Sequence, residues 1–218
     1  MNACVYIPIK TNNTRLPGKT FKLLNKKPLY EYLFSTVKKL NIPVYIDSSD
    51  DKVLKIAEKW EFKTLKRPEE FNADSIAGND LLMRIIDKLD CDIVVMLHIT
   101  SPFLKTDTIK KAISIINGNK ELDSLFGVVP RYNRFWFENQ PVNHSLKNLI
   151  RTQDLIPVKE EAADFYLFKK NSFKKYKKRV CGKFGLLDVS KIEATDIDNL
   201  EDFIYAEALI KSGIIKSE

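Results

Sequence analysis

Short apolar runs alternate with amphipathic segments along most of the chain. Residues 3–9 (A-C-V-Y-I-P-I) and 92–97 (D-I-V-V-M-L) are apolar runs with polar flanks, so both predict buried strands. In residues 28–40, apolar side chains recur at helical spacing at Leu29, Leu33 and Val37, which predicts a helix. Further strands are expected at 43–46, 124–129 and 164–168, and further helices at 52–60, 78–89, 106–117 and 199–211. This alternation indicates an α/β fold with a mostly parallel sheet and helices on both faces.

The segment from residue 130 to residue 161 breaks this alternation. It contains an aromatic run, Phe135 to Phe137, together with Pro141 and Pro157. We interpret it as an excursion that leaves the sheet and returns at the strand expected from residue 164. No internal repeat or low-complexity linker divides the rest, so we expect one domain over residues 1–218, with the excursion at about 130–164.

The composition is typical of an ordinary globular protein. Of 218 residues, 44% are hydrophobic and 30% are charged, which excludes wholesale disorder. No apolar run approaches the roughly 20 residues that a membrane helix needs, and residues 1–10 show no signal-peptide pattern. Cys4, Cys91 and Cys181 are scattered, and no two have metal-ligand spacing. We therefore expect reduced cysteines, a cytoplasmic location and no insertion into a membrane.

The net charge of +7 favours an anionic partner, which could be a nucleic acid, a membrane surface or a phosphorylated metabolite. Most of the basic residues are dispersed, but residues 174–179 form a cluster that contains Tyr176 and follows Phe173. Basic and aromatic residues together could bind a nucleic acid, and the alternative is a solvated, lysine-rich surface. We favour the solvated surface and expect no nucleic-acid partner.

A cationic loop follows the first expected strand. Lys10, Arg15 and Lys19 fall within ten residues, and Gly18 allows a tight backbone beside the last of them. Such a loop lies at the carboxyl edge of a parallel sheet, where these folds bind ligands, and loop amides with fixed cations favour a polyphosphate. The loop matches neither a Walker motif nor a dinucleotide fingerprint. Its charge pattern alone therefore leaves a solvated basic loop as an alternative.

The letters of this loop, I-P-I-K-T-N-N-T-R-L-P-G-K at 7–19, resemble the signature I-P-A-R-x-x-S-x-R-L-P-x-K of the sugar-acid cytidylyltransferases. That family includes the enzymes that make CMP-sialic acid and CMP-3-deoxy-manno-octulosonate. Further segments resemble the family in the same order and cover nearly the whole chain, closest to the acylneuraminate branch. They are F-K-L-L-N-K-K-P-L (21–29), R-P-E-E-F-N-A-D-S (67–75), H-I-T-S-P-F (98–103), R-T-Q-D-L-I-P-V (151–158) and T-D-I-D-N-L-E-D-F (195–203).

The resemblance implies a fold, a reaction and partners. The implied fold is a Rossmann-like (GT-A-like) nucleotidyltransferase, a three-layer sandwich whose excursion serves dimerisation. The implied reaction transfers CMP from CTP to an acidic acceptor, such as a nonulosonic sugar acid, and releases pyrophosphate. The implied cofactor is Mg²⁺, and the implied assembly is a homodimer in which excursion residues reach the acceptor pocket of the partner.

The resemblance also assigns roles residue by residue. Lys10 stands where the family has an arginine that faces the triphosphate, Lys19 matches a phosphate-binding lysine, and Arg67 matches a residue that reads the cytosine. Asp196 and Asp198 match the aspartates that hold the metal. The expected catalytic residues are Lys10, Arg15, Lys19, Asp196 and Asp198. The other expected nucleotide-binding residues are Ile9, Asp74 and Ser75, and the expected acceptor-binding residues are His98, Thr100, Arg131, Arg151 and Gln153.

Asp196 and Asp198 allow two physical interpretations. Two carboxylates at positions i and i+2 of an extended segment face the same side, and hard oxygen ligands suit Mg²⁺. However, Asp198 followed by Glu201 also has the spacing of an N-cap and capping box before the last helix. Without the resemblance, capping would be the preferred interpretation. With it, we favour metal binding for Asp196 and leave both roles open for Asp198.

The chain departs from the family pattern mainly where the acceptor would bind. Lys10 replaces arginine, Asn12 and Asn13 replace glycine and serine, and His98 replaces glutamine. The sequence A-A-D at 162–164 stands where the acylneuraminate enzymes have N-G-A. Three hypotheses follow: a synthetase of a CMP-sugar acid, a cytidylyltransferase for another acidic acceptor such as a phosphonate or phosphate, and a non-catalytic nucleotide-binding module.

Overall fold

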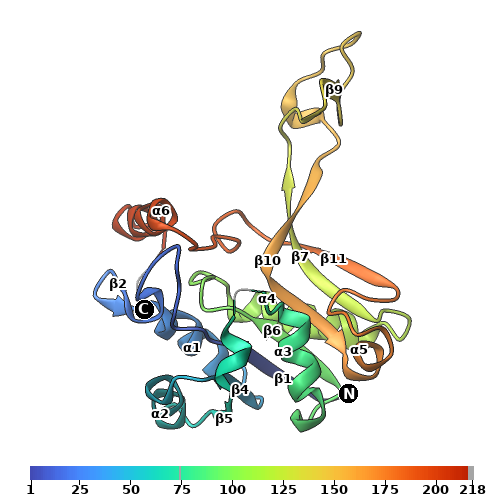
Figure 1. The fold of residues 1–218 in the computed structure, drawn as a ribbon. Helices are drawn as coiled ribbons and strands as arrows, with labels where there is room; N and C mark the ends of the chain where they lie inside the picture. Colours follow the sequence, from blue (N-terminus) through green and yellow to red (C-terminus); the bar gives the residue numbers. More distant parts are fainter. Residues whose placement is uncertain (74, 216–218) are drawn as a thin grey trace.

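A seven-stranded sheet forms the centre of the computed structural model, which describes residues 1–73 and 75–215, without the side chains of residues 163 and 164. The strand order is β11-β7-β10-β6-β1-β4-β5 (Figure 1). The strands are β1 (Ala3–Pro8), β4 (Val44–Ser48), β5 (Lys63–Lys66), β6 (Ile93–Leu97), β7 (Ser124–Arg131), β10 (Val158–Lys169) and β11 (Phe184–Asp188). All neighbouring strands pair in parallel except β10, which runs antiparallel to β6 and β7. The predicted α/β fold with a mostly parallel sheet is confirmed.

Helices cover both faces of the sheet because the strand side chains alternate between two apolar surfaces. One surface, which includes Val5 and Val95, packs against α1 (Leu29–Lys38), α2 (Asp51–Lys59) and α4 (Thr106–Gly118). The other surface, which includes Tyr6 and Met96, packs against α3 (Gly78–Ile85) and α5 (Lys170–Tyr176). The successive side chains of a strand point to opposite faces, so this division follows directly from the apolar runs in the sequence.

A third apolar cluster fixes the last helix beside the loop that follows β1. Phe203, Ala206 and Leu209 of α6 (Leu200–Lys211) pack with Leu16 from that loop and with Phe103. Residues 195–199, immediately before α6, are thereby held against the carboxyl edge of the sheet. The small strands β2 (Leu23–Leu24) and β3 (Lys27–Pro28) pair with each other next to this cluster.

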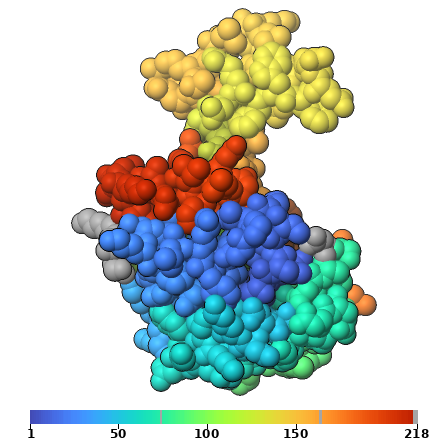
Figure 2. Space-filling view, turned by 60° about the vertical axis from the view of Figure 1, so that its left-hand side comes forward, coloured from blue at the N-terminus to red at the C-terminus, as the bar shows by residue number. Residues whose placement is uncertain are grey.

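Residues between β7 and β10 form a stalk that projects away from the sheet (Figures 1 and 2). Its base is the paired ends of the two strands, where Val158 lies opposite Arg131. Its tip carries the hairpin of β8 (Trp136–Phe137) and β9 (Gln140–Pro141), which turns through two residues of positive φ, Glu138 at 45° and Asn139 at 63°. The interpretation of this segment as an excursion from the sheet therefore agrees with the structure.

The cysteines differ from the expectation of three reduced thiols. The structure joins Cys4 of β1 to Cys91, two residues before the start of β6, in a disulfide with a Cα–Cα distance of 5.7 Å. Eighty-seven positions separate the two residues in the sequence, so their proximity arises only from the pairing of the strands. Cys181 is buried and free. Within the described residues, no helix is both long and apolar enough to cross a membrane.

Candidate active site

The cationic loop and the aspartate segment meet at one cavity at the carboxyl ends of β1 and β6. The cavity has a volume of about 300 Å³. It is lined by Pro8, Lys10, Asn13, Arg15, Lys19, His98, Ile99, Thr100, Asp196 and Asp198. Residues that are 188 positions apart in the sequence, such as Lys10 and Asp198, therefore share one surface. All five residues predicted to be catalytic are in this set.

Lys19 and Arg15 both converge on Asp198. Gly18 has a φ of 69°, a conformation that favours glycine, and turns the chain into the short 3-10 helix Lys19–Phe21. The turn directs Lys19 inwards, where its Nζ donates to the backbone oxygen of Ile197 at 2.9 Å and lies 3.2 Å from Asp198 Oδ1. The more exposed Arg15 places a guanidinium nitrogen 2.8 Å from the other oxygen, Oδ2. Two cations thus surround a single carboxylate.

The backbone of the loop is held in place by its own side chains. Asn13 Nδ2 donates to the Lys10 carbonyl at 2.9 Å, and the Thr20 hydroxyl lies 3.4 Å from the same oxygen. These bonds bring the two ends of the loop together around Lys10. Asn13, one of the departures from the family pattern, therefore has a structural role in shaping the cationic loop.

The aspartate segment is fixed from two sides. The backbone N–H of Ile197 donates to the Thr100 carbonyl at 2.9 Å, which ties the segment to the loop after β6. The N-cap of α6 is Asn199, whose side chain accepts from the Asp202 amide at 3.0 Å, while the Asp202 carboxylate accepts from the amides of Asn199 and Asp198. The alternative that Asp198 and Glu201 form the capping box is therefore wrong. Asn199 performs the capping, and the Asp198 side chain is left for the cavity.

Asp196 and Asp198 have the chemistry that a magnesium site needs. Both carboxylates line the same cavity, and Mg²⁺ takes oxygen ligands, one or two of them carboxylates, with phosphates and water completing the octahedron. Within the part of the chain that the structure describes, no group of three or more His, Cys, Asp or Glu residues could hold a metal by itself. The residues present therefore fit an ion that is shared with a nucleotide better than a closed protein site.

His98 is neutral at physiological pH. Burial, and next the positive charge of Arg179, lower the pKa of its imidazole from 6.5 to about 4. Its Nε2 is shielded from solvent and has no hydrogen-bond partner within the described residues. A buried polar atom of this kind is costly unless a partner is supplied. His98 is thus a candidate to bind a polar group of a ligand.

Among the other residues predicted to bind the nucleotide, Arg67, Ile9 and Ser75 do not line this cavity. Arg67 is only 2% exposed, and its guanidinium donates to the Asp47 carbonyl at 2.7 Å. Ile9 is buried, and its amide donates to the same carbonyl at 2.8 Å. Ser75 is exposed in a turn, and Asp74 lies outside the described residues. The roles of these four residues in nucleotide binding stay predictions.

The predicted acceptor residues divide into two groups. His98 and Thr100 line the cavity, whereas Arg131, Arg151 and Gln153 lie on the stalk. Within the chain, Arg131 pairs with Glu160, and Arg151 Nε lies 2.7 Å from Asp154 Oδ2. The structure therefore brings only His98 and Thr100 to the catalytic residues of the same subunit.

A family model described as cytidylyltransferase matches residues 4–212, which include the loop, the aspartate segment and nearly all of the sheet. The chain belongs to the cytidylyltransferase family. By this membership it is a CTP-dependent nucleotidyltransferase.

Several relatives of this cytidylyltransferase carry names that specify a sugar acid as the acceptor. A 3-deoxy-manno-octulosonate cytidylyltransferase from Hydrogenovibrio crunogenus is 26% identical, with 100% of this chain and 91% of the relative covered. An 8-amino-3,8-dideoxy-manno-octulosonate cytidylyltransferase from Shewanella baltica is 24% identical over 92% of the chain and 84% of the relative. An N-acylneuraminate cytidylyltransferase from Danio rerio is 26% identical over 71% of the chain and 38% of the relative.

Solved structures confirm the predicted nucleotidyltransferase fold. A CMP:2-keto-3-deoxy-manno-octonic acid synthetase complexed with CTP superimposes with a TM-score of 0.73 at 14% identity, covering 98% of this chain and 100% of that one. A 4-diphosphocytidyl-2C-methyl-D-erythritol synthase from Anaerococcus prevotii gives 0.67 at 13% identity, covering 96% and 98%.

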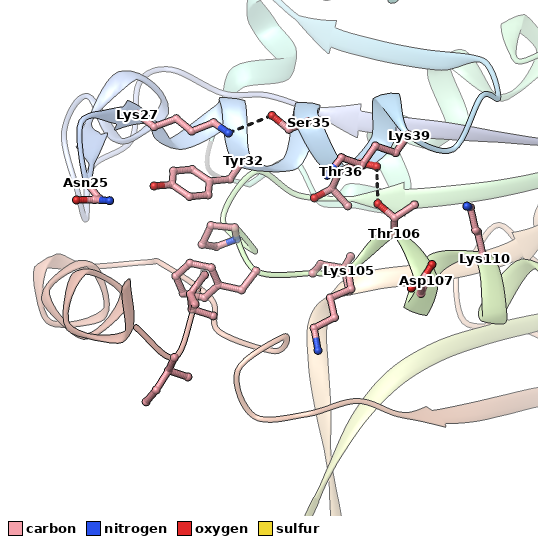
Figure 3. A pocket seen from close by; sticks show the side chains of 15 residues that line it. Asn25, Lys27, Tyr32, Ser35, Thr36, Lys39, Lys105, Thr106, Asp107 and Lys110 are labelled. Carbon is pink, nitrogen blue, oxygen red and sulfur yellow. Dashed lines mark hydrogen bonds between the residues drawn. The ribbon is translucent and has the colours of Figure 1, made fainter. Parts of the chain in front are cut away.

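A larger cavity of the cytidylyltransferase lies elsewhere, between α1 and the start of α4 (Figure 3). Its volume is about 620 Å³, and its walls include Tyr32, Thr36 and Lys110. A hydrogen bond of 2.9 Å from the Thr106 hydroxyl to the Thr36 carbonyl joins the two helices there. None of the predicted site residues lines this cavity, so chemistry rather than size identifies the active site.

Arg179 is the residue near the site that the sequence did not indicate. In the sequence it ends a run of lysines, and we assigned that run to a solvated surface. In the structure its guanidinium carbon lies 3.9 Å from the centre of the Tyr166 ring, and its charge acts on His98. The only signal in the sequence was a single arginine among lysines. The proximity of Arg179 to His98 arises from the packing of β10, α3 and β6, which the sequence does not show.

Proposed function

We propose that this cytidylyltransferase transfers CMP from CTP to the hydroxyl of a sugar acid and releases pyrophosphate. One observation carries the proposal: Lys10, Arg15 and Lys19 line a single cavity together with Asp196 and Asp198 at the carboxyl ends of the strands. Cations bind the triphosphate, carboxylates hold a metal, and this combination matches the requirements of nucleotidyl transfer. The names of the relatives support a sugar acid as the acceptor.

The loop cations bind and neutralise the phosphates of CTP. Lys19 is positioned by the Ile197 carbonyl, so its ammonium group stays at the cavity when a phosphate replaces Asp198 as its partner. Arg15 offers a planar fork that can contact two phosphate oxygens, while Lys10 acts as a point charge. Charge on the leaving pyrophosphate is thereby offset before the reaction begins, as expected when catalysis rests on positioning and electrostatics.

The reaction is an in-line displacement at the α-phosphorus. The acceptor oxygen forms a new bond to this phosphorus and loses its proton, while the bond from the phosphorus to the bridging oxygen breaks and pyrophosphate leaves with the electron pair. Asp196 and Asp198 would hold Mg²⁺, which, when bound, would neutralise phosphate charge and lower the pKa of the acceptor hydroxyl. Neutral His98 is available to hydrogen-bond the acceptor and fix its orientation.

The stalk is proposed to pair two copies of the chain. It exposes several large apolar side chains, among them Ile156 at 81%, Phe137 at 68% and Leu149 at 65%. Exposed apolar groups gathered on one projecting segment are typical of a protein interface. In a homodimer of this kind, Arg131, Arg151 and Gln153 would be placed to approach the acceptor of the partner.

The proposal is tested by pyrophosphate release. Each of the four nucleoside triphosphates is combined with 3-deoxy-manno-octulosonate, its 8-amino-3,8-dideoxy analogue and N-acetylneuraminate in the presence of Mg²⁺. Pyrophosphate release that depends on both CTP and one of these acids supports the proposal. CTP binding without turnover of any acid would favour a non-catalytic nucleotide-binding module, and turnover only with a phosphonate or phosphate would favour the other class of acceptor.

A further inference from the structure

Arg179 is held in place by contacts with two elements, β10 and α3. It stacks on Tyr166 of β10 at 3.9 Å, an arrangement that stabilises a cation over an aromatic face. The Arg179 amide donates to Asn79 Oδ1 of α3 at 3.1 Å. A Cβ placed on Gly78 would come within 2.8 Å of a guanidinium nitrogen, so the first residue of α3 lies directly against it. The side chain is half-buried and therefore preorganised rather than free in solvent.

Among the side chains that the structure describes, which do not include those of Asp74 and Asp164, this guanidinium has no acidic partner. The other arginines near the sheet edge are neutralised: Arg84 lies 2.5 Å from Asp47, and Arg15 lies 2.8 Å from Asp198. On the stalk, Arg131 and Arg151 have carboxylates of their own. A half-buried cation that contacts an aromatic ring but no carboxylate can accept an anionic ligand without first breaking an ion pair.

Arg179 lies beside the end of β6 that leads to His98, because a Cβ placed on Gly78 would contact both the Arg179 guanidinium and the Met96 side chain. In β6, Met96 points to the face of the sheet that α3 covers, and alternation directs His98 to the same face. Tyr166 belongs to that apolar cluster as well. Arg179 lines neither the 300 Å³ cavity nor the smaller cavity of about 160 Å³ formed by the loop cations. Its charge therefore acts at a position next to, and distinct from, the triphosphate.

We propose that Arg179 binds the carboxylate of the acceptor acid and thereby selects acidic acceptors in the same subunit. This inference rests on the proposed function. A planar guanidinium fixed on Tyr166 matches a carboxylate in geometry and can donate two parallel hydrogen bonds to it. His98 would at the same time supply its unpartnered Nε2 to a hydroxyl of the same acceptor. Acceptor recognition would then require no cation from the stalk.

The test compares an acid with its neutral ester. The probes are 3-deoxy-manno-octulosonate and its methyl ester, with N-acetylneuraminate and its methyl ester as a second pair. Arg179→Gln is expected to raise the KM for the acid roughly 10- to 100-fold, the range for losing a hydrogen-bonded charge pair, and to leave the KM for CTP and for the ester within about two-fold. Lys178→Gln, which removes an exposed neighbouring charge, is the matched control and should change neither value.

Two further measurements keep the inference falsifiable. Arg179→Lys retains the charge without the fork and should give an intermediate KM, which covers the case in which the glutamine variant folds poorly. Thermal-shift titration measures binding of acid and ester to the wild-type protein and to the variants, whether or not turnover occurs. An unchanged preference for acid over ester in Arg179→Gln would overturn the inference, as would a raised KM for CTP alone. Absence of turnover in the wild-type protein would refute the proposed function instead.

Discussion

At the scale of single residues, Asp198 and Lys19 form the centre of the site. Lys19 is buried, with only 7% of its surface exposed. Its ammonium group contacts the Ile197 carbonyl and the Asp198 carboxylate at the cavity. Holding a lysine head group in this position costs solvation that these contacts recover only partly. A bound phosphate would provide the remaining hydrogen-bond partner of the Lys19 ammonium group. Substitutions of Lys19 and Asp198 therefore test the proposed mechanism most directly.

Lys19→Met is expected to reduce kcat for CTP-dependent pyrophosphate release by about 100-fold or more, because a fixed cation facing the leaving group is typically worth that much. Methionine keeps the volume of the buried stem, so the fold should persist. Lys191→Met, at an exposed position, serves as the control. A variant at position 19 that keeps wild-type kcat with a normal circular-dichroism spectrum would contradict the assignment.

Asp198→Asn should abolish most of the turnover with little loss of stability, because the capping of α6 belongs to Asn199. Asn199→Ala should show the opposite pattern, with the free energy of unfolding lower by about 1 kcal/mol, the usual cost of losing an N-cap. Kinetics and urea denaturation of both variants provide the comparison. Equal loss of stability in the two would show that the aspartate also supports the helix.

His98 gives a prediction about pH. Burial, followed by the charge of Arg179, places its pKa at about 4 in the folded protein against 6.5 for the unperturbed side chain. Between these values the unfolded chain binds more protons, so the free energy of unfolding decreases as pH falls from 6.5 towards 4. His98→Gln removes this contribution, and the difference in stability between variant and wild type should grow by roughly 3 kcal/mol between pH 7 and pH 4. Urea titrations of both proteins in metal-free buffer measure the free energy of unfolding at each pH. If the two proteins show the same dependence on pH, the prediction is refuted.

At the scale of elements, the strands that could be predicted from the sequence are those whose side chains are buried. The central strands β1 and β6 were predicted because every one of their positions from residue 4 to 7 and from 93 to 97 is apolar and buried. The strands β5 and β11 at the sheet edges were missed, since Lys63 and Lys66 are exposed and β11 alternates only weakly. An edge strand is stabilised largely by pairing with its neighbouring strand. The local sequence pattern contains no information about that neighbour.

The candidate site was predictable to the extent that it is made of local motifs. The cations of residues 10–19 and the aspartates at 196 and 198 are each encoded by one short segment, and the structure brings these segments together at the sheet edge. The contact of Arg179 with Tyr166 and Gly78 involves three segments with no common motif. Likewise, the partner of Arg67 could not be read from the sequence, because Asp47 comes from the neighbouring strand.

At the scale of the whole molecule, the stalk projects away from the part that carries the candidate site. The tip of the stalk lies well away from the central sheet (Figure 1). An exposed leucine or isoleucine gains about 2 kcal/mol when it becomes fully buried at an interface. Burial of several such residues would be the main stabilising contribution to the proposed association between two copies.

Ile156→Glu together with Leu149→Glu is expected to convert the proposed dimer to a monomer, because two charges would have to be buried at the interface. Sedimentation velocity at micromolar concentration gives the assembly state, and calorimetry shows whether the body of the protein stays folded. Lys147→Glu, a charged change on the same exposed segment, is the control. A wild-type protein that remains monomeric, or a double variant that remains dimeric, would contradict the proposed role of the stalk.

The strand β10 runs without interruption through both parts of the molecule. Its 12 residues begin at the stalk with Val158 and end between β6 and β7, and Tyr166, the platform for Arg179, lies near the inner end. At about 3.3 Å per residue it is a rod of roughly 40 Å. A load applied at the tip is transmitted along the backbone of this strand, and we expect it to shift the Tyr166 ring at the other end. A nanobody clamped to the β8–β9 hairpin should therefore alter acceptor affinity by mechanical means, without occupying the pocket.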